Sequence, residues 1–197
     1  EALSWQGGKW LREPLAGVPD LGTASVTAVD DLDSDDFFLV TASPLQPSTL
    51  SLGSLPPSGA PRAGAVEKLK SAPSFFDAKG LVVEQHEATS ADGTKIPYFQ
   101  IGPKSLPLDG STPTLLYGYG GFEIPLLPGY EAVTGAAWLE KGNVSVIANI
   151  RGGGEFGPAW HQSALKANRP RAYEDFIAVG EDLVRRKVTS PAHLGIK

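Results

Sequence analysis

The stretch Thr-Leu-Leu-Tyr-Gly-Tyr-Gly-Gly-Phe, residues 114–122, joins a short apolar run to a loop in which aromatic rings alternate with glycines. The run from Thr114 to Tyr117 has the composition of a buried strand. The glycines allow the following backbone to turn sharply or to lie close to a ligand. Rings on such a loop are either packed inward or held out for recognition. The stretch therefore predicts a buried strand that ends in a candidate binding loop.

The chain that follows this loop alternates strands with helices. Val144 to Ile150 is a near-continuous apolar run of the kind that is buried in a parallel sheet. Helices are expected over residues 130–141 and 170–187, and a further strand is expected to begin at His193. This alternation of strands and helices along the chain is typical of a parallel α/β sheet.

Both expected helices show an apolar stripe at helical spacing. The first ends at Lys141 and Gly142, a good C-terminal signal. In the second, Glu174 and Asp175 near the start and basic residues near the end complement the helix dipole. The predicted stripes are Tyr130, Val133, Ala137 and Trp138 in the first helix, and Tyr173, Phe176, Ile177, Gly180, Leu183 and Val184 in the second.

The residues before Thr114 have the composition and spacing of β-strands joined by turns. Residues 81–89 and 96–101 look extended, and the Asp92-Gly93 turn between them predicts a hairpin. Residues 1 to about 71 are rich in Gly, Pro and Ser, with three short apolar runs separated by polar turns. Such runs are typical of a sandwich, a barrel or a propeller blade. They are residues 25–29, 37–41 and 49–52.

The composition excludes several classes of partner. Lys and Arg number 17 against 22 Asp and Glu, which gives a net charge of -5 and leaves no basic run for a nucleic acid. No apolar run approaches the roughly 20 residues that span a bilayer. The absence of cysteine excludes disulfides and leaves the cellular compartment open.

The chain starts at Glu1 and has no methionine, so we expect an internal fragment of a longer protein.

Two motifs are better interpreted as structural than as binding sites. Gly152 to Gly157 satisfies Gly-x-Gly-x-x-Gly after a strand, but the acidic residue that a dinucleotide site needs at the end of the next strand is missing. Asp31, Asp33 and Asp35 imitate a calcium loop, yet Asp36 stands where that loop needs glycine. The three histidines have no metal-ligand spacing, and we expect neither metal nor cofactor.

Longer runs of the sequence closely resemble the prolyl oligopeptidase family of serine peptidases. They agree with the family in order and spacing over about eighty residues, although Gly-x-Ser-x-Gly occurs nowhere in the chain. These runs are Leu-Leu-Tyr-Gly-Tyr-Gly-Gly-Phe (115–122), Ala-Asn-Ile-Arg-Gly-Gly-Gly-Glu-Phe-Gly-Pro-Ala-Trp-His (148–161), Tyr-Glu-Asp-Phe (173–176) and Thr-Ser-Pro (189–191).

The resemblance implies a fold and a domain organisation. Members of this family join a β-propeller to an α/β-hydrolase domain. Residues 1–71 would form the end of the propeller, and residues 72–197 the first half of the hydrolase sheet. The nucleophilic Ser would follow shortly after residue 197, and the Asp and His would lie further on. The isolated chain is then expected to be inactive.

The resemblance also implies site residues and substrates. Tyr119 would donate its hydroxyl to the oxyanion, and Phe122 would line the pocket for the residue before the scissile bond. Tyr117 and Trp160 are expected to pack in the core. The substrates would be short peptides cleaved after proline by a monomeric full-length enzyme, with no cofactor.

Other interpretations stay open at this point. Tyr119 could instead be a buried ring whose hydroxyl bonds to a neighbour. The whole protein could be an esterase or aminopeptidase of the same fold, an oxidoreductase that binds a dinucleotide on the Gly152 loop, or a non-catalytic interaction module. The Arg151–Gly157 segment matches the family without an assigned chemical role.

Overall fold

The computed structural model describes residues 1–55 and 66–197 and divides into two compact units, Glu1–Ser74 and Phe75–Lys197. Residues 56–65 of the expected propeller segment lie outside the described residues. Each unit has its own sheet and its own hydrophobic cluster.

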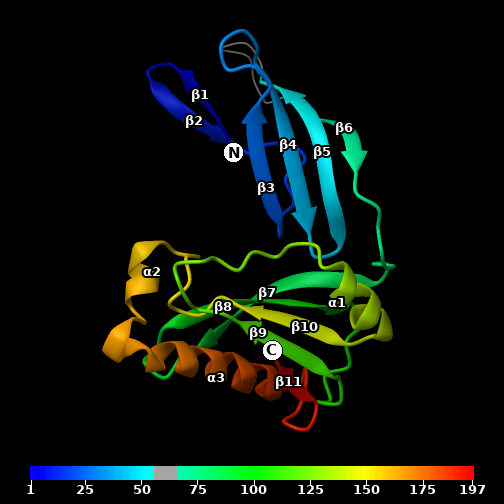
Figure 1. Cartoon of the computed structure of the whole chain (residues 1–197), viewed down its shortest axis with the longest axis vertical. Helices are drawn as coiled ribbons and strands as arrows, with labels where there is room; N and C mark the ends of the chain where they lie inside the picture. Colours follow the sequence, from blue (N-terminus) through cyan, green and yellow to red (C-terminus); the bar gives the residue numbers. More distant parts are fainter. Residues whose placement is uncertain (56–65) are drawn as a thin grey trace. The chain divides into compact units, whose positions relative to one another are not determined.

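The first unit is built from antiparallel strands (Figure 1). A two-stranded ribbon, β1–β2, accompanies a four-stranded sheet in the order β3-β4-β5-β6. Phe37 and Leu39, on the buried side of β4, pack with Leu15. The strands are β1 (Ala2–Gln6), β2 (Lys9–Glu13), β3 (Thr23–Ala28), β4 (Asp36–Ser43), β5 (Gln46–Ser54) and β6 (Glu67–Ser71).

The three predicted runs of this unit form β3, β4 and β5, while β1, β2 and β6 were not predicted from the sequence. The strand β6 reads Glu-Lys-Leu-Lys-Ser, and its first four residues are exposed. Such a strand has no buried side and therefore no apolar alternation to detect.

The second unit contains a five-stranded mixed sheet in the order β11-β9-β10-β8-β7. Strands β10, β9 and β11 run parallel to one another. Strands β7 and β8 form the expected hairpin, and β8 pairs with β10 in the antiparallel direction. The α/β class and the strand order along the chain are confirmed in this unit. The strands are β7 (Leu81–Thr89), β8 (Lys95–Pro103), β9 (Thr114–Gly118), β10 (Val144–Ala148) and β11 (Leu194–Ile196).

The helical segments of this unit are short, with one exception (Figure 1). The long helix α3 packs on the sheet, and its Val179 and Leu183 join a core with Tyr98, Leu116 and Val146. The helical segments are α1 (Ala132–Ala137), η1 (Leu139–Lys141), α2 (Pro158–Gln162), η2 (Lys166–Asn168) and α3 (Pro170–Arg185).

The predicted apolar stripe of the first helix is wrong. Val133 is 80% exposed, and the buried positions are Gly135 and Leu139 instead. A Cβ on Gly135 would overlap the ring of Phe76, so this helix is held by the close approach of a ring to its backbone. The predicted end is confirmed, because Gly142 closes the segment with a left-handed φ of 81°.

The predicted stripe of α3 is also displaced. Tyr173 and Ile177 are each 58% exposed, and the buried face includes Asp175 and Asp182. The helix begins at Pro170, so Asp175 lies beyond the first turn and does not serve the helix dipole. Each buried aspartate instead has a partner outside the helix: the Tyr98 hydroxyl on β8 donates to Asp182 at 2.6 Å, and Arg151, in the loop after β10, bonds Asp175.

Arg151 lies at the centre of a buried polar network. Its guanidinium donates to Asp175 at 2.7 and 2.9 Å and to Asp92 at 2.6 Å, and its backbone N–H donates to Asp175 at 3.0 Å. Ser90 adds a 2.6 Å bond to Asp175. The network ties the β7–β8 turn, the residues after β10 and helix α3 to one side chain. Arg151 is 3% exposed and Asp175 is 0% exposed, so each buried charge would be strongly destabilising without the opposite charge of its partner.

The same network determines the titration of Asp92. The hydrogen bond from Arg151 is the main cause that lowers the pKa of Asp92 below its ordinary value of 3.8. The charged carboxylate therefore stabilises the folded state at pH values above 3.8. This contribution is lost as the pH falls below that value and towards the lower pKa of the folded state.

We expect Arg151→Met to lower the free energy of unfolding by about 3 to 5 kcal/mol, because it leaves the Asp175 carboxylate buried without its partner. Urea unfolding followed by circular dichroism measures this difference. Arg171→Met is a matched control on the same helix as Asp175, since Arg171 bonds only the Ser163 carbonyl among the described residues. A loss for Arg151→Met no larger than that of the control would contradict the role of the network.

We expect Asp92→Asn to be less stable than the parent chain at neutral pH, and the gap to narrow as the pH falls below about 3.8. The reason is that the parent loses its charged Asp92 in this range, whereas the variant has no charge to lose. Urea midpoints at several pH values measure the gap. A gap of constant size down to about pH 2 would show that Asp92 is not linked to folding.

Candidate functional site

Two glycine-containing loops leave the same edge of the second sheet. Strands β9 and β10 are parallel, with Gly118 opposite Ala148, so the loops that follow them emerge side by side. Strand β11 is parallel to β9 on its other side and ends at the same edge. In open α/β sheets, ligands bind beyond the carboxyl ends of the strands. This edge is therefore the candidate functional site.

The two loops touch through their glycines. Gly120 has a φ of 57°, and a Cβ on it would lie 2.6 Å from Ile150 and 2.7 Å from the Arg151 carbonyl oxygen. Gly152 has a φ of 97°, and a Cβ there would overlap the Gly120 carbonyl. At Gly120 the close approach that requires glycine is thus to the neighbouring loop and not to a ligand. The side of Gly120 that a Cβ would occupy faces the neighbouring loop.

The first loop carries backbone strain next to its rings. Phe122 and Glu123 have φ values of 52° and 56°, which non-glycine residues rarely adopt. The turn is closed by the Ile124 N–H, which donates to the Gly121 carbonyl at 3.0 Å. Two adjacent left-handed residues persist only where the surroundings determine the conformation, and such strain is concentrated at functional sites.

Tyr119 lines a hollow of about 280 Å³ at this edge. The residue is 39% exposed, and within residues 1–55 and 66–197 its hydroxyl makes no hydrogen bond. This position argues against the alternative of a buried ring bonded to a neighbour. The walls also include Ile150, Arg169, Tyr173, Phe176 and Lys197.

Phe122 stands outside the hollow and is 81% exposed. Its ring lies 6.5 Å from that of Tyr119 between centroids, at an angle of 27°. The two rings thus form one aromatic face next to the hollow. Trp160 and Tyr117, the two residues expected to pack in the core, are less exposed than this pair. Trp160 is partly buried against the core and donates to the Ile150 carbonyl, and Tyr117 is half-buried.

Two further side chains at this site were not singled out from the sequence. The Arg169 guanidinium donates to the Gly120 carbonyl oxygen and lies 5.3 Å from the centroid of the Tyr173 ring. The Nδ1 atom of His161 lies 3.1 Å from the Glu123 backbone nitrogen and 2.6 Å from the Gly152 carbonyl oxygen. Both contacts are to backbone atoms of distant residues, and no sequence pattern signals such contacts.

The second loop is occupied by its own hydrogen bonds. The Gly152 N–H donates to the Trp160 carbonyl at 3.2 Å, and the Gly157 N–H donates to the Gly154 carbonyl at 3.1 Å. A dinucleotide loop needs free N–H groups at the start of a helix for the pyrophosphate. The helix that follows, α2, has five residues. This geometry does not favour the oxidoreductase alternative.

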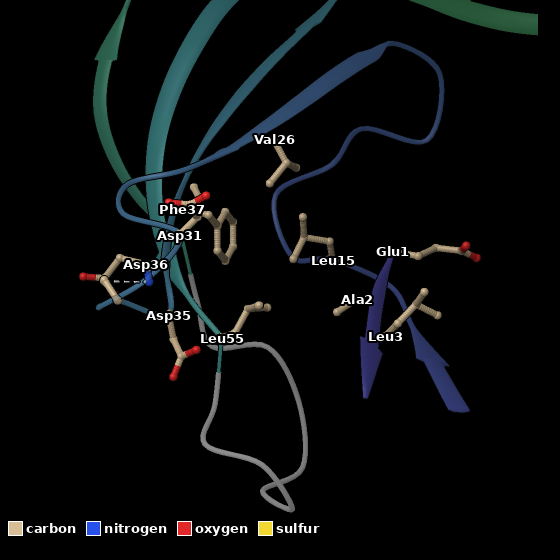
Figure 2. A pocket seen from close by; sticks show the side chains of 12 residues that line it. Glu1, Ala2, Leu3, Leu15, Val26, Asp31, Asp35, Asp36, Phe37 and Leu55 are labelled. Atoms are coloured by element: carbon tan, nitrogen blue, oxygen red, sulfur yellow. Dashed lines mark hydrogen bonds between the residues drawn. The ribbon is translucent and has the colours of Figure 1, made fainter. Parts of the chain in front are cut away.

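A separate hollow of about 480 Å³ lies in the first unit (Figure 2). Figure 2 shows Phe37 and Leu15 on facing sides of it, with Asp35 and Asp36 nearby. The Asp30 carboxylate accepts the backbone N–H groups of Leu32 and Asp33, as in a polar turn. Among the described residues, no group of three or more His, Asp or Glu side chains is arranged to hold a metal ion.

None of the helices in the described part of the chain has the length and hydrophobicity needed to span a membrane.

Comparison with known proteins identifies relatives of the whole chain. The sequence model of the prolyl oligopeptidase family matches residues 131–197. The uncharacterized peptidase y4nA of Sinorhizobium fredii is 51% identical over the full chain, which covers 26% of that protein. A prolyl endopeptidase of Elizabethkingia miricola is 44% identical over 61% of the chain and 17% of its own length.

Solved structures give the same result. A post-proline cleaving enzyme from Rickettsia typhi superimposes with a TM-score of 0.78 at 34% identity, over 98% of this chain and 27% of that one. The 197 residues thus span about a quarter of the length of the relatives that they match throughout. By sequence and by structure, the chain belongs to the prolyl oligopeptidase family.

Proposed function

We propose that the whole protein is a serine peptidase that cleaves short peptides after proline through an acyl-enzyme. The observation that carries this proposal is the exposed, unbonded hydroxyl of Tyr119 at the carboxyl edge of the sheet, beside the end of β11. The names of the relatives, which include prolyl endopeptidases, support the same reaction. Other reactions of the same fold, such as ester hydrolysis, are outcomes of the tests below.

The proposed role of Tyr119 is to stabilise the oxyanion. When a nucleophile attacks a peptide carbonyl, negative charge develops on the carbonyl oxygen. A hydroxyl that already faces this position stabilises the transition state more than the substrate, because the charge is absent in the ground state. A Tyr119 hydroxyl with no partner among the described residues is available to donate in this way.

The nucleophile and its partners are supplied by other parts of the proposed enzyme. The 197 residues contain no Gly-x-Ser-x-Gly elbow, and we therefore propose that they are inactive alone. Because β11 is parallel to β9, its carboxyl end lies at the same edge of the sheet as Tyr119, and a segment that continues from β11 would emerge next to Tyr119. A serine on a turn at this edge would lie on the same side of the sheet as the Tyr119 hydroxyl.

We propose that Phe122 contributes to recognition of proline. Its exposed ring lies beside that of Tyr119, where a flat surface can pack against a pyrrolidine ring. We also propose that the first unit, with its four-stranded antiparallel sheet, is part of a β-propeller and that the second unit is part of an α/β-hydrolase domain. A four-stranded sheet is the composition of one propeller blade.

In the full-length protein, Tyr119→Phe should lower kcat for a proline-containing peptide amide by about 100-fold to 1000-fold, because one oxyanion donor is lost. KM should change little, since the hydroxyl acts in the transition state. Steady-state kinetics measure both constants, and Tyr117→Phe, a change on the preceding strand β9, is the control. A rise in KM with an unchanged kcat would assign Tyr119 to substrate binding instead.

Phe122→Ala should reduce the preference for proline over alanine before the scissile bond by about tenfold, through loss of ring packing. The measurement is the ratio of kcat/KM for two peptides that differ only at this residue. Phe156→Ala removes another exposed ring, one that packs on Trp160, and serves as the control. An unchanged ratio for Phe122→Ala would remove Phe122 from the pocket.

A further inference from the structure

The loop that carries Tyr119 and Phe122 is held by one side chain at each end. Arg169 bonds the carbonyl of Gly120, which directly follows Tyr119. His161 bonds the N–H of Glu123, which directly follows Phe122. The first contact fixes the peptide plane between Gly120 and Gly121, one residue beyond Tyr119, and the second fixes the peptide plane between Phe122 and Glu123. Neither Arg169 nor His161 has a chemical role of its own in the proposed reaction.

Arg169 is well placed to hold a carbonyl. It immediately precedes α3, and its guanidinium lies over the Tyr173 ring at 5.3 Å, which restricts the side chain. Hydrogen bonds from a charged donor are stronger than those between neutral groups. The Gly120 carbonyl also lies against Gly152, so the peptide between Gly120 and Gly121 is held from two sides.

His161 joins the two loops through a single ring nitrogen. Its Nδ1 lies 2.6 Å from the Gly152 carbonyl and 3.1 Å from the Glu123 nitrogen. A protonated Nδ1 donates to Gly152, whereas an unprotonated Nδ1 accepts from Glu123. The Glu123 N–H also lies 3.3 Å from the Gly152 carbonyl, so it has an acceptor in both cases. The 2.6 Å separation fits a protonated Nδ1 that donates to the Gly152 carbonyl, which also accepts the Glu123 N–H, so the histidine holds this junction through the Gly152 carbonyl.

The strain in the loop makes such contacts necessary. Phe122 and Glu123 both have left-handed backbone conformations, and a free loop would leave them. Phe122 is 81% exposed, and the ring contact of its side chain in the described part of the chain is the one with Tyr119 on the same loop. Its direction is therefore determined by the backbone, and the backbone is held at Glu123.

We propose that Arg169 and His161 are positioning residues, Arg169 for the hydroxyl of Tyr119 and His161 for the ring of Phe122. The inference rests on the proposed function of these two residues. It gives the second loop a role as well, since Gly152 provides the surface against which both contacts close. Loss of Arg169 should affect the rate of the chemical step, and loss of His161 should affect selectivity.

The first test replaces Arg169 in the full-length protein. Arg169→Leu should lower kcat for a proline peptide amide by about tenfold to 100-fold, since a small displacement of a catalytic group is costly. Arg169→Lys, which keeps a charged donor, should recover part of the loss. In the double variant with Tyr119→Phe, the two effects should not add. Arg171→Leu, the same change two positions away, is the matched control.

The second test replaces His161. His161→Ala should lower the ratio of kcat/KM for proline over alanine peptides several-fold, with a smaller effect on kcat. His161→Asn should restore the ratio, because its amide offers a donor and an acceptor near the position of Nδ1. The effect should not add to that of Phe122→Ala. Gln162→Ala, an exposed neighbour on the same helix, is the control.

The outcomes separate the two levels of the proposal. If Tyr119→Phe and Phe122→Ala change rate and selectivity but Arg169→Leu and His161→Ala match their controls, the positioning role is overturned and the proposed function stands. If Tyr119→Phe and Phe122→Ala themselves have no effect, the proposed function fails. Additive double variants would also overturn the positioning role. Should Arg169→Leu not fold, Arg169→Gln takes its place in the same double-variant comparison.

Discussion

The close approach of two glycines, Gly120 and Gly152, is the constraint on which the candidate site depends. Parallel pairing of β9 and β10 brings their following loops to one edge, and the missing side chains let the backbones meet. A Cβ at either position would collide with the other loop or with Ile150. The contact fixes the start of the turn that presents Tyr119 and Phe122. Geometry at the site is thus determined by backbone packing.

A buried charged pair stabilises the second loop at this edge of the sheet. Arg151 directly precedes Gly152, and its bonds to Asp175 and Asp92 anchor the second loop to helix α3 and to the β7–β8 turn. Removing water from two charges is costly, and the cost is offset only where further hydrogen bonds satisfy both groups. Ser90 and the Arg151 backbone N–H supply such bonds to Asp175. The arrangement of the second loop therefore does not depend on apolar packing alone.

Sequence patterns predicted the parts of this fold that depend on local spacing. The apolar runs of β9 and β10, the Asp92-Gly93 hairpin and the closing Gly142 were confirmed. Strand β6 and the faces of α1 and α3 were missed. A strand that is exposed on both sides has no alternation, and a buried Asp175 gives no signal without its partner at Arg151, 24 positions away. At the site, Tyr119 and Phe122 came from the family resemblance, whereas the contacts of Arg169 and His161 depend on tertiary packing.

The most direct measurement is a crystal structure of the full-length protein with a peptide aldehyde that has proline before the reactive carbon. Attack on the aldehyde gives a tetrahedral adduct whose oxygen stands in for the oxyanion of the reaction. We expect the Tyr119 hydroxyl to lie about 2.7 to 3.1 Å from this oxygen, with the Phe122 ring against the pyrrolidine. A Tyr119 hydroxyl that points to solvent while other groups bind this oxygen would contradict this expectation.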